Sequence, residues 1–159
     1  MKISLTLNGE ARVADLPPMM RLLDALREHL GHPGTKEGCG EGECGTCTVL
    51  LDGEAVNACM VVVGQCDGRD VVTVEGLAKA EHLTPLQEAF MRDGGAQCGI
   101  CTPGMLIASE ALLRRRPSPS DEEIREAIAG NLCRCTGYQR IVESVRKASE
   151  ILRASETGR

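Results

Sequence analysis

The pattern of apolar and polar positions changes character about halfway along the chain. In the first half, apolar residues alternate with polar ones in short runs such as 3–7, which is typical of strands with one buried face. Asn8-Gly9 and Asp52-Gly53 stand between such runs and predict tight hairpins. A small mixed sheet crossed by one helix, at 20–30, is therefore predicted, with further strands at 11–13, 48–51, 55–57 and 71–74.

From about residue 84 onward, the apolar positions follow the repeat of helices. Thr84 stands before Pro85 and three residues before Gln87, and Ser120 stands three residues before Glu123, so both segments carry helix-capping signals. Four short helices joined by short loops predict a bundle. They are expected from 85 onward, from 102 to a break at Ser118-Pro119, from 121 to Gly130, and from 139 to 154.

The change of pattern near Gly76 predicts an α+β protein with two domains, 1–76 and 77–159. Domains this small seldom fold on aliphatic burial alone. Large rings are scarce, because the chain has one Tyr, one Phe and no Trp. It also has nine cysteines, and we expect these to supply the missing stabilisation in each half.

Charge and hydropathy exclude several classes of protein. The formal net charge is −5, whereas proteins that bind nucleic acid through its phosphates are usually basic. No apolar run approaches the length of a membrane-spanning helix, and the N-terminus turns polar by Asn8, too early for a secretory signal. We therefore expect a cytoplasmic protein that binds neither nucleic acid nor membrane. In a reducing cytoplasm, clustered cysteines indicate metal binding rather than disulfides.

The first half carries four cysteines with the spacing C-x4-C-x2-C-x11-C: Cys39, Cys44, Cys47 and Cys59. The first three match the spacing of plant-type [2Fe-2S] ferredoxins. Glycine occupies half of the positions from 38 to 45, as expected where a loop wraps closely and turns its backbone N–H groups towards negatively charged sulfur. Zinc sites more often pair two C-x2-C motifs, so the pattern favours a [2Fe-2S] site over a zinc site.

The second half carries four more cysteines with the spacing C-x2-C-x31-C-x-C: Cys98, Cys101, Cys133 and Cys135. By spacing alone, this group fits a zinc site, a redox pair or a cluster. Cys101 directly precedes the predicted helix start at Thr102, so the positive end of a helix dipole would face the group. All four positions fall in loops at one end of the predicted bundle. Cys66 remains outside both groups and is expected to be a buried, apolar side chain.

Three segments, 38–47, 97–105 and 130–138, resemble the small iron–sulfur subunit of the molybdenum hydroxylases. This is the xanthine oxidase family, which includes carbon monoxide dehydrogenase, 4-hydroxybenzoyl-CoA reductase and dehydrogenases of N-heterocycles. The resemblance implies a β-grasp, plant-type ferredoxin-like domain followed by a four-helix-bundle domain, each with one [2Fe-2S] cluster. It assigns the first cysteine group to one cluster and the second group to the other. It also implies that Gln97 and Cys135 lie close to a pterin held by another chain.

The resemblance further implies a role in electron transfer within a larger complex. Electrons would pass between molybdopterin, in its cytosine dinucleotide form, in a large subunit and FAD in a medium subunit, within a dimer of heterotrimers. The residues agree, because no catalytic dyad or triad is evident and the chain alone is not expected to turn over substrate. The alternatives are a freestanding ferredoxin-like carrier and a zinc-stabilised interaction module, which would be colourless.

Overall fold

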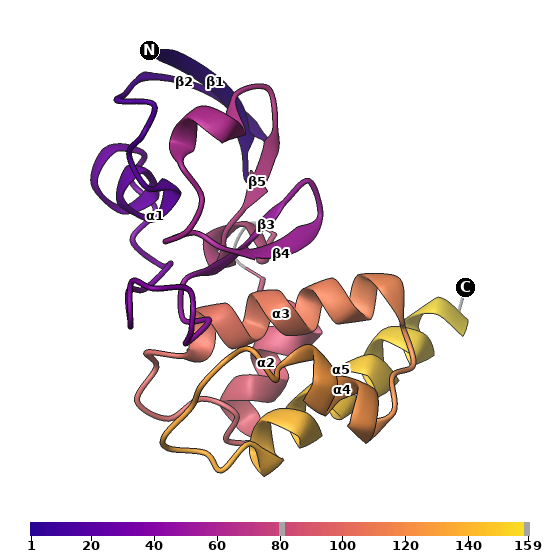
Figure 1. Ribbon diagram of the computed structural model, residues 1–159. Coiled ribbons are helices and arrows are strands. Elements are labelled where there is room, and N and C mark those ends of the chain that lie inside the picture. The colour runs from indigo at the N-terminus through magenta and orange to yellow at the C-terminus, as the bar shows by residue number, and fades with distance from the viewer. Residues whose placement is uncertain (80–81, 158–159) are drawn as a thin grey trace.

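The computed structural model describes residues 1–79 and 82–157, so positions 80–81 and 158–159 of the predicted second domain lie outside the description. A sheet-bearing half lies above a helical half, and α3 runs along the boundary between them (Figure 1). The sheet has the strand order β2-β1-β5-β3-β4. Only the β1–β5 pair is parallel, so the sheet is mixed as predicted. The strands are β1 (Lys2–Leu7), β2 (Glu10–Asp15), β3 (Thr48–Leu51), β4 (Glu54–Asn57) and β5 (Asp70–Val72).

Both predicted hairpins are confirmed. Asn8 and Gly9 have φ of 53° and 84°, and Asp52 and Gly53 have φ of 50° and 85°. Two consecutive left-handed residues make the tight turn whose twist matches that of paired strands, and Asn-Gly and Asp-Gly tolerate that backbone best. The turns place β2 beside β1 and β4 beside β3.

The helix predicted at 20–30 is shorter and less regular than expected. It consists of one α-helical turn, α1 (Leu22–Asp24), followed by a π-helical turn, η1 (Ala25–His29). The wider turn arises because the N–H of Leu30 donates to the carbonyl of Ala25, five residues back, at 2.9 Å. The segment still buries its leucines against the sheet.

Two short 3-10 turns were not predicted: η2 (Val63–Cys66) and η3 (Val74–Gly76). The second corrects the strand predicted at 71–74, which ends at Val72 because the chain turns from Val74 onward. Cys66 lies in η2 and is fully buried in the core of the sheet half, which confirms its predicted role as an apolar side chain.

The helical half contains the four predicted helices: α2 (Pro85–Arg92), α3 (Thr102–Arg115), α4 (Asp121–Ala127) and α5 (Gln139–Thr157). Both predicted capping boxes form, with reciprocal hydrogen bonds between Thr84 and Gln87 and between Ser120 and Glu123. Helix α4 ends at Ala127, before the predicted Gly130, and α5 runs past the predicted end at 154. None of the described helices is long and apolar enough to cross a membrane.

The two halves have separate apolar cores that meet at β3. Leu50 points into the helical core, whereas its neighbours Val49 and Leu51 point into the core of the sheet half. Alternate residues of a strand face opposite sides, so one short strand serves both cores. Helix α3 packs on the Leu50 side and covers β3 and β4. The cysteine-bearing loops lie near this boundary.

Candidate metal centres

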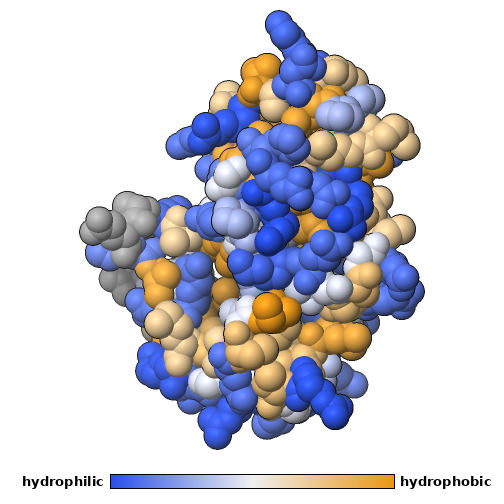
Figure 2. Space-filling view, turned by 90° about the vertical axis from the view of Figure 1, so that its left-hand side faces the viewer, coloured by the Kyte–Doolittle hydropathy of each residue, from blue (hydrophilic) through white to orange (hydrophobic). Residues whose placement is uncertain are grey.

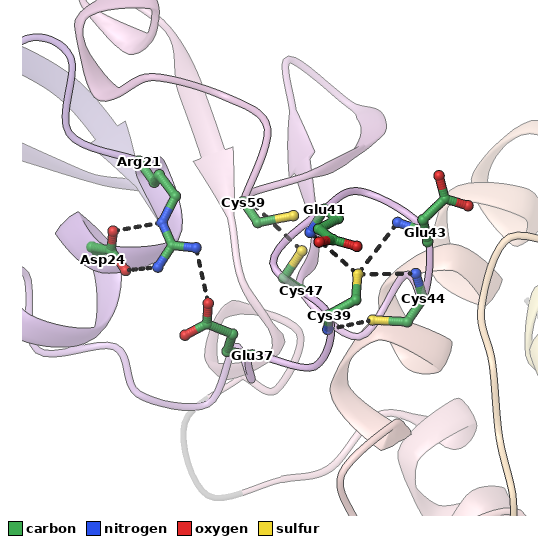
Figure 3. A network of polar contacts seen from close by, with 9 residues as sticks. All are labelled: Arg21, Asp24, Glu37, Cys39, Glu41, Glu43, Cys44, Cys47 and Cys59. Carbon is green, nitrogen blue, oxygen red and sulfur yellow. Dashed lines mark hydrogen bonds and ion pairs between the residues drawn. The ribbon is translucent and has the colours of Figure 1, made fainter.

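The loop of residues 38–47 wraps its backbone around the sulfur of Cys39. The N–H groups of Glu41, Glu43 and Cys44 donate to Cys39 Sγ at 3.3, 3.4 and 3.4 Å (Figure 3). The N–H of Cys39 in turn donates to Cys44 Sγ at 3.3 Å. This is the inward-turned backbone that the glycine-rich sequence predicted, and it stabilises negative charge on the two sulfurs.

Cys47 and Cys59 form a second pair beside this loop. The N–H of Cys59 donates to Cys47 Sγ at 3.5 Å, and both residues are buried (Figure 3). The first group is therefore brought together as two pairs: exposed Cys39 with half-buried Cys44, and buried Cys47 with buried Cys59.

The two pairs differ in how readily a thiolate forms. Backbone hydrogen bonds from Glu41, Cys44 and Glu43 lower the pKa of Cys39 to about 7. Burial raises the pKa of Cys47 to about 11. A buried thiolate needs a compensating positive charge, which a metal ion supplies. The buried pair is thus suited to a metal rather than to free thiolates.

The second cysteine group also assembles as two neighbouring pairs, Cys98 beside Cys135 and Cys101 beside Cys133. Cys101 is the residue before the first turn of α3, as predicted. The four thiols border a cavity of about 240 Å³ that is lined mainly by apolar atoms and is completed by Thr46, Ile100, Leu132 and Arg134.

The two less exposed cysteines of this group, Cys101 and Cys133, also differ in how readily they form a thiolate. Burial, followed by the hydrogen bond with Cys133, raises the pKa of Cys101 to about 12. Burial is the largest influence on Cys133 and also raises its pKa, but hydrogen bonds from Thr136, Cys135 and Cys101 together outweigh it and lower the pKa of that thiol. Cys133 is therefore the member of the pair that carries negative charge more easily.

This pairwise arrangement bears on the kind of metal. A [2Fe-2S] unit has two irons sharing four cysteine ligands, so the two pairs of thiols in each group match its ligand set. The residues present therefore fit two diiron clusters.

The residues expected to face another chain lie at the surface. Gln97 and Cys135 are both exposed. Near them, Ile100 and Leu132 are large apolar side chains that are 54% and 56% exposed. Figure 2, which views the molecule from the left-hand side of Figure 1, shows apolar surface gathered over the helical half.

Several residues around the two groups were not singled out in the sequence. Asn131 is buried between the halves, and its Nδ2 donates to the carbonyl of Gly45 at 2.9 Å. Thr136 and Tyr138 make hydrogen bonds to Cys133. The one available signal was that these polar residues stand within five positions of predicted ligands. Spacing alone does not tell which of them turn inward.

Comparison with known proteins places these groups in a family. Residues 5–78 match the family model described as "2Fe-2S iron-sulfur cluster binding domain", and residues 73–146 match the "[2Fe-2S] binding domain". The chain is 51% identical over 148 residues to the nicotinate dehydrogenase small FeS subunit of Eubacterium barkeri, covering 93% of this chain and 94% of that one. It is 47% identical over 148 residues to the nicotine 6-hydroxylase small subunit of Paenarthrobacter nicotinovorans, covering 93% and 89%.

Among solved structures, the quinoline 2-oxidoreductase of Pseudomonas putida 86 superposes with a TM-score of 0.93 and 46% identity, covering 98% of each chain. Cysteine-lined loops within two matched [2Fe-2S] domains define an iron–sulfur electron-transfer protein. The chain belongs to the family of small [2Fe-2S] subunits of the molybdenum hydroxylases, and it acts as the electron-transfer subunit of a multi-subunit oxidoreductase. The resemblance inferred from the sequence is thereby confirmed.

Proposed function

We propose that this chain carries two [2Fe-2S] clusters and relays electrons between molybdopterin in a large subunit and FAD in a medium subunit. Cys39, Cys44, Cys47 and Cys59 hold one cluster, and Cys98, Cys101, Cys133 and Cys135 hold the other. Each cluster, when bound, accepts and returns one electron at a time. The proposed domains are a β-grasp, plant-type ferredoxin-like unit at 1–76 and a four-helix-bundle unit at 77–159.

The observation that carries this proposal is a direct link between the two cysteine groups. The N–H of Leu132 donates to the carbonyl oxygen of Cys44 at 2.9 Å, and Leu132 is bonded to Cys133. One hydrogen bond therefore connects a ligand of the first group to a ligand of the second along the backbone. Electron tunnelling is faster through bonds and hydrogen bonds than through empty space, so this contact supports a relay.

The chain's own residues keep this link in place. Asn131 Nδ2 donates to the carbonyl of Gly45 at 2.9 Å and to Thr48 Oγ1 at 3.2 Å, next to the Leu132–Cys44 bond. Cys47 and Cys59 are buried beside this link, and α3 packs on β3 next to it. Backbone N–H groups stabilise charge on the sulfur of Cys39 in the first group.

The exposure of Cys98 and Cys135 supports the assignment of the second group to the molybdenum side. Gln97 and Cys135 are proposed to contact molybdopterin, in the cytosine dinucleotide form, on the large subunit. Exposed Ile100 and Leu132 lie in the same region and offer apolar surface for that subunit to cover. The first group would then lie nearer the FAD. A dimer of heterotrimers and a cytoplasmic location remain predictions from the sequence.

The test is to purify the complex under native conditions and to assay iron, acid-labile sulfide, molybdenum and flavin. We expect about four irons per copy of this chain, with matching sulfide, from two clusters. After reduction with dithionite, low-temperature EPR should show two S = 1/2 signals. One zinc per cysteine group in colourless material would contradict the proposal.

Three variants assign the signals. Cys39→Ser should remove one EPR signal, and Cys98→Ser should remove the other. Cys66→Ala is the matched control, because Cys66 is buried outside both groups and its loss should leave both signals intact. Loss of a cluster signal in Cys66→Ala would contradict the assigned ligand sets.

A further inference from the structure

The sulfur of Cys133 has a hydrogen-bond donor of a kind that the other cysteines lack. The hydroxyl of Thr136 donates to Cys133 Sγ at 3.2 Å. Within the described part of the chain, no other hydroxyl donates to a cysteine sulfur, and in the first group the donors are backbone N–H groups. The charge on Cys133 is therefore influenced by a side chain that a substitution can remove.

Thr136 is itself held in a fixed orientation. The N–H of Tyr138 donates to Thr136 Oγ1 at 3.2 Å, so this oxygen accepts one hydrogen bond while its own hydrogen points to the sulfur. A hydroxyl that already accepts a hydrogen bond is polarised and becomes a better donor. The amide and the hydroxyl thus form a short chain of hydrogen bonds that ends on Cys133 Sγ.

The side chain of Tyr138 also binds the backbone of Cys133. Its phenol oxygen accepts a hydrogen bond from the N–H of Cys133 at 2.9 Å. The ring is half-buried and packs against the helical core, and this packing holds the phenol oxygen in place. Tyr138 also has a φ of 68°, a left-handed conformation that is unfavourable for a bulky residue. A non-glycine residue held there is constrained by its surroundings, which here are the bonds to Thr136 and Cys133.

We infer that Thr136 is a positioning residue that raises the reduction potential of the cluster held by the second cysteine group, and that Tyr138 holds Thr136 in place. The inference rests on the proposed function, because it requires a cluster at Cys133. Reduction adds one electron and no proton, and part of the added negative charge falls on the ligand sulfurs. An O–H dipole aimed at one of these sulfurs stabilises the reduced form more than the oxidised form.

The alternative is that Thr136 only shapes the loop. A purely structural hydroxyl would alter folding or iron content when removed, but it would not move the potential of a cluster that still assembles. The two roles therefore separate by a potential measurement combined with a substitution that keeps the shape of the side chain.

The experiment compares Thr136→Val with Thr136→Ser in the complete complex. Valine keeps the volume of threonine without the hydroxyl, and serine keeps the hydroxyl without the methyl group. Each complex is titrated with dithionite at controlled potentials, both [2Fe-2S] EPR signals are followed, and iron is counted. At the potential where half of the second cluster is reduced in the wild type, Thr136→Val should lower the reduced-to-oxidised ratio roughly two- to tenfold, as expected for one hydrogen bond.

Thr136→Ser should restore a ratio near that of the wild type, and the other cluster signal should not shift in either variant. A cluster that is lost in Thr136→Val but kept in Thr136→Ser would match the purely structural role and would also overturn the inference. An unchanged ratio in Thr136→Val, or equal effects of both substitutions, would overturn the inference. If the wild type itself lacks two cluster signals, the proposed function fails first, and this inference fails with it.

Discussion

Gly104, in the first turn of α3, lies directly against the backbone carbonyl of Gly45, so that a Cβ at Gly104 would stand 2.3 Å from that oxygen. A Cβ at Gly45 would in turn stand 2.3 Å from the carbonyl oxygen of Gly130. The two halves therefore meet backbone to backbone, beside the loops that carry Cys44 and Cys133. Only glycine allows so close an approach.

Substitution of Gly104 by alanine should separate the halves. The clash is with backbone, which has no side-chain freedom to move away, and overpacking of this kind costs about 3 kcal/mol at the upper end of its usual range. The gain in helix propensity offsets only about 1 kcal/mol. Gly130→Ala is the matched control, because a Cβ there meets nothing within 4 Å. Thermal unfolding should show a lower melting temperature for Gly104→Ala alone, and equal melting temperatures would refute the contact.

The side chain of Asn131 should stabilise the same boundary. It is buried, and Asn131→Ala removes the donor to Gly45 O and Thr48 Oγ1, which should reduce the free energy of unfolding by about 1–3 kcal/mol. Asn131→Asp should be worse, because a carboxylate would place negative charge against a carbonyl oxygen. Denaturant unfolding of the three proteins measures this order. A more stable aspartate variant would show that the amide does not donate here.

The ion pair between α2 and α5 predicts a pH dependence. Hydrogen bonds from Arg92 and Lys147 hold the pKa of Asp93 below its usual range, and Lys147 Nζ lies 3.0 Å from Asp93 Oδ1. Because the folded-state pKa is depressed, the stabilisation is present above the unfolded-state pKa of about 4 and is lost as the pH falls below it.

Asp93→Asn tests this expectation. At pH 7 the variant should melt below the wild type, and the gap should stay constant down to about pH 4 and close below that value. Loss of clusters in acid affects both proteins alike, so the difference between them is the quantity to follow. A gap that does not narrow as the pH falls below 4 would mean that the charge of Asp93 is not what stabilises the fold.

Arg21 should restrain the loop of the first cysteine group. Its guanidinium makes two bonds to Asp24, both 2.7 Å, and a third to Glu37 at 2.8 Å, which ties α1 to the chain just before Cys39 (Figure 3). Arg21→Lys keeps the charge but cannot make this planar, forked set of bonds. The groups are partly exposed, so we expect a modest effect: iron should leave the first site a few-fold faster under a chelator.

A lysine at Arg12, whose ion pair with Glu10 lies on the distant β2 strand, is the control for this experiment. It should release iron at the wild-type rate. Equal release from Arg21→Lys and Arg12→Lys would show that the bonds to Asp24 and Glu37 do not restrain the loop.

Local features of the fold were predictable because their causes lie close together in the chain. The Asn8-Gly9 turn depends on two adjacent residues, and the capping box of Thr84 depends on a residue three positions later. The helix at 20–30 was placed correctly, but its π-helical turn was not predicted. A wider turn leaves the spacing of apolar residues almost unchanged, so the sequence pattern does not distinguish it from an α-helix.

The amino-acid sequence by itself determined the number and kind of the sulfur donors and the family to which the chain belongs, because these depend on residue identity and short spacings. It left open which cysteine pairs with which, and it gave no sign that Leu132 binds Cys44 or that Gly104 meets Gly45. Such contacts join residues 59 to 88 positions apart. They exist only once α3 has packed on β3, because packing decides which backbone groups of distant segments come within bonding distance.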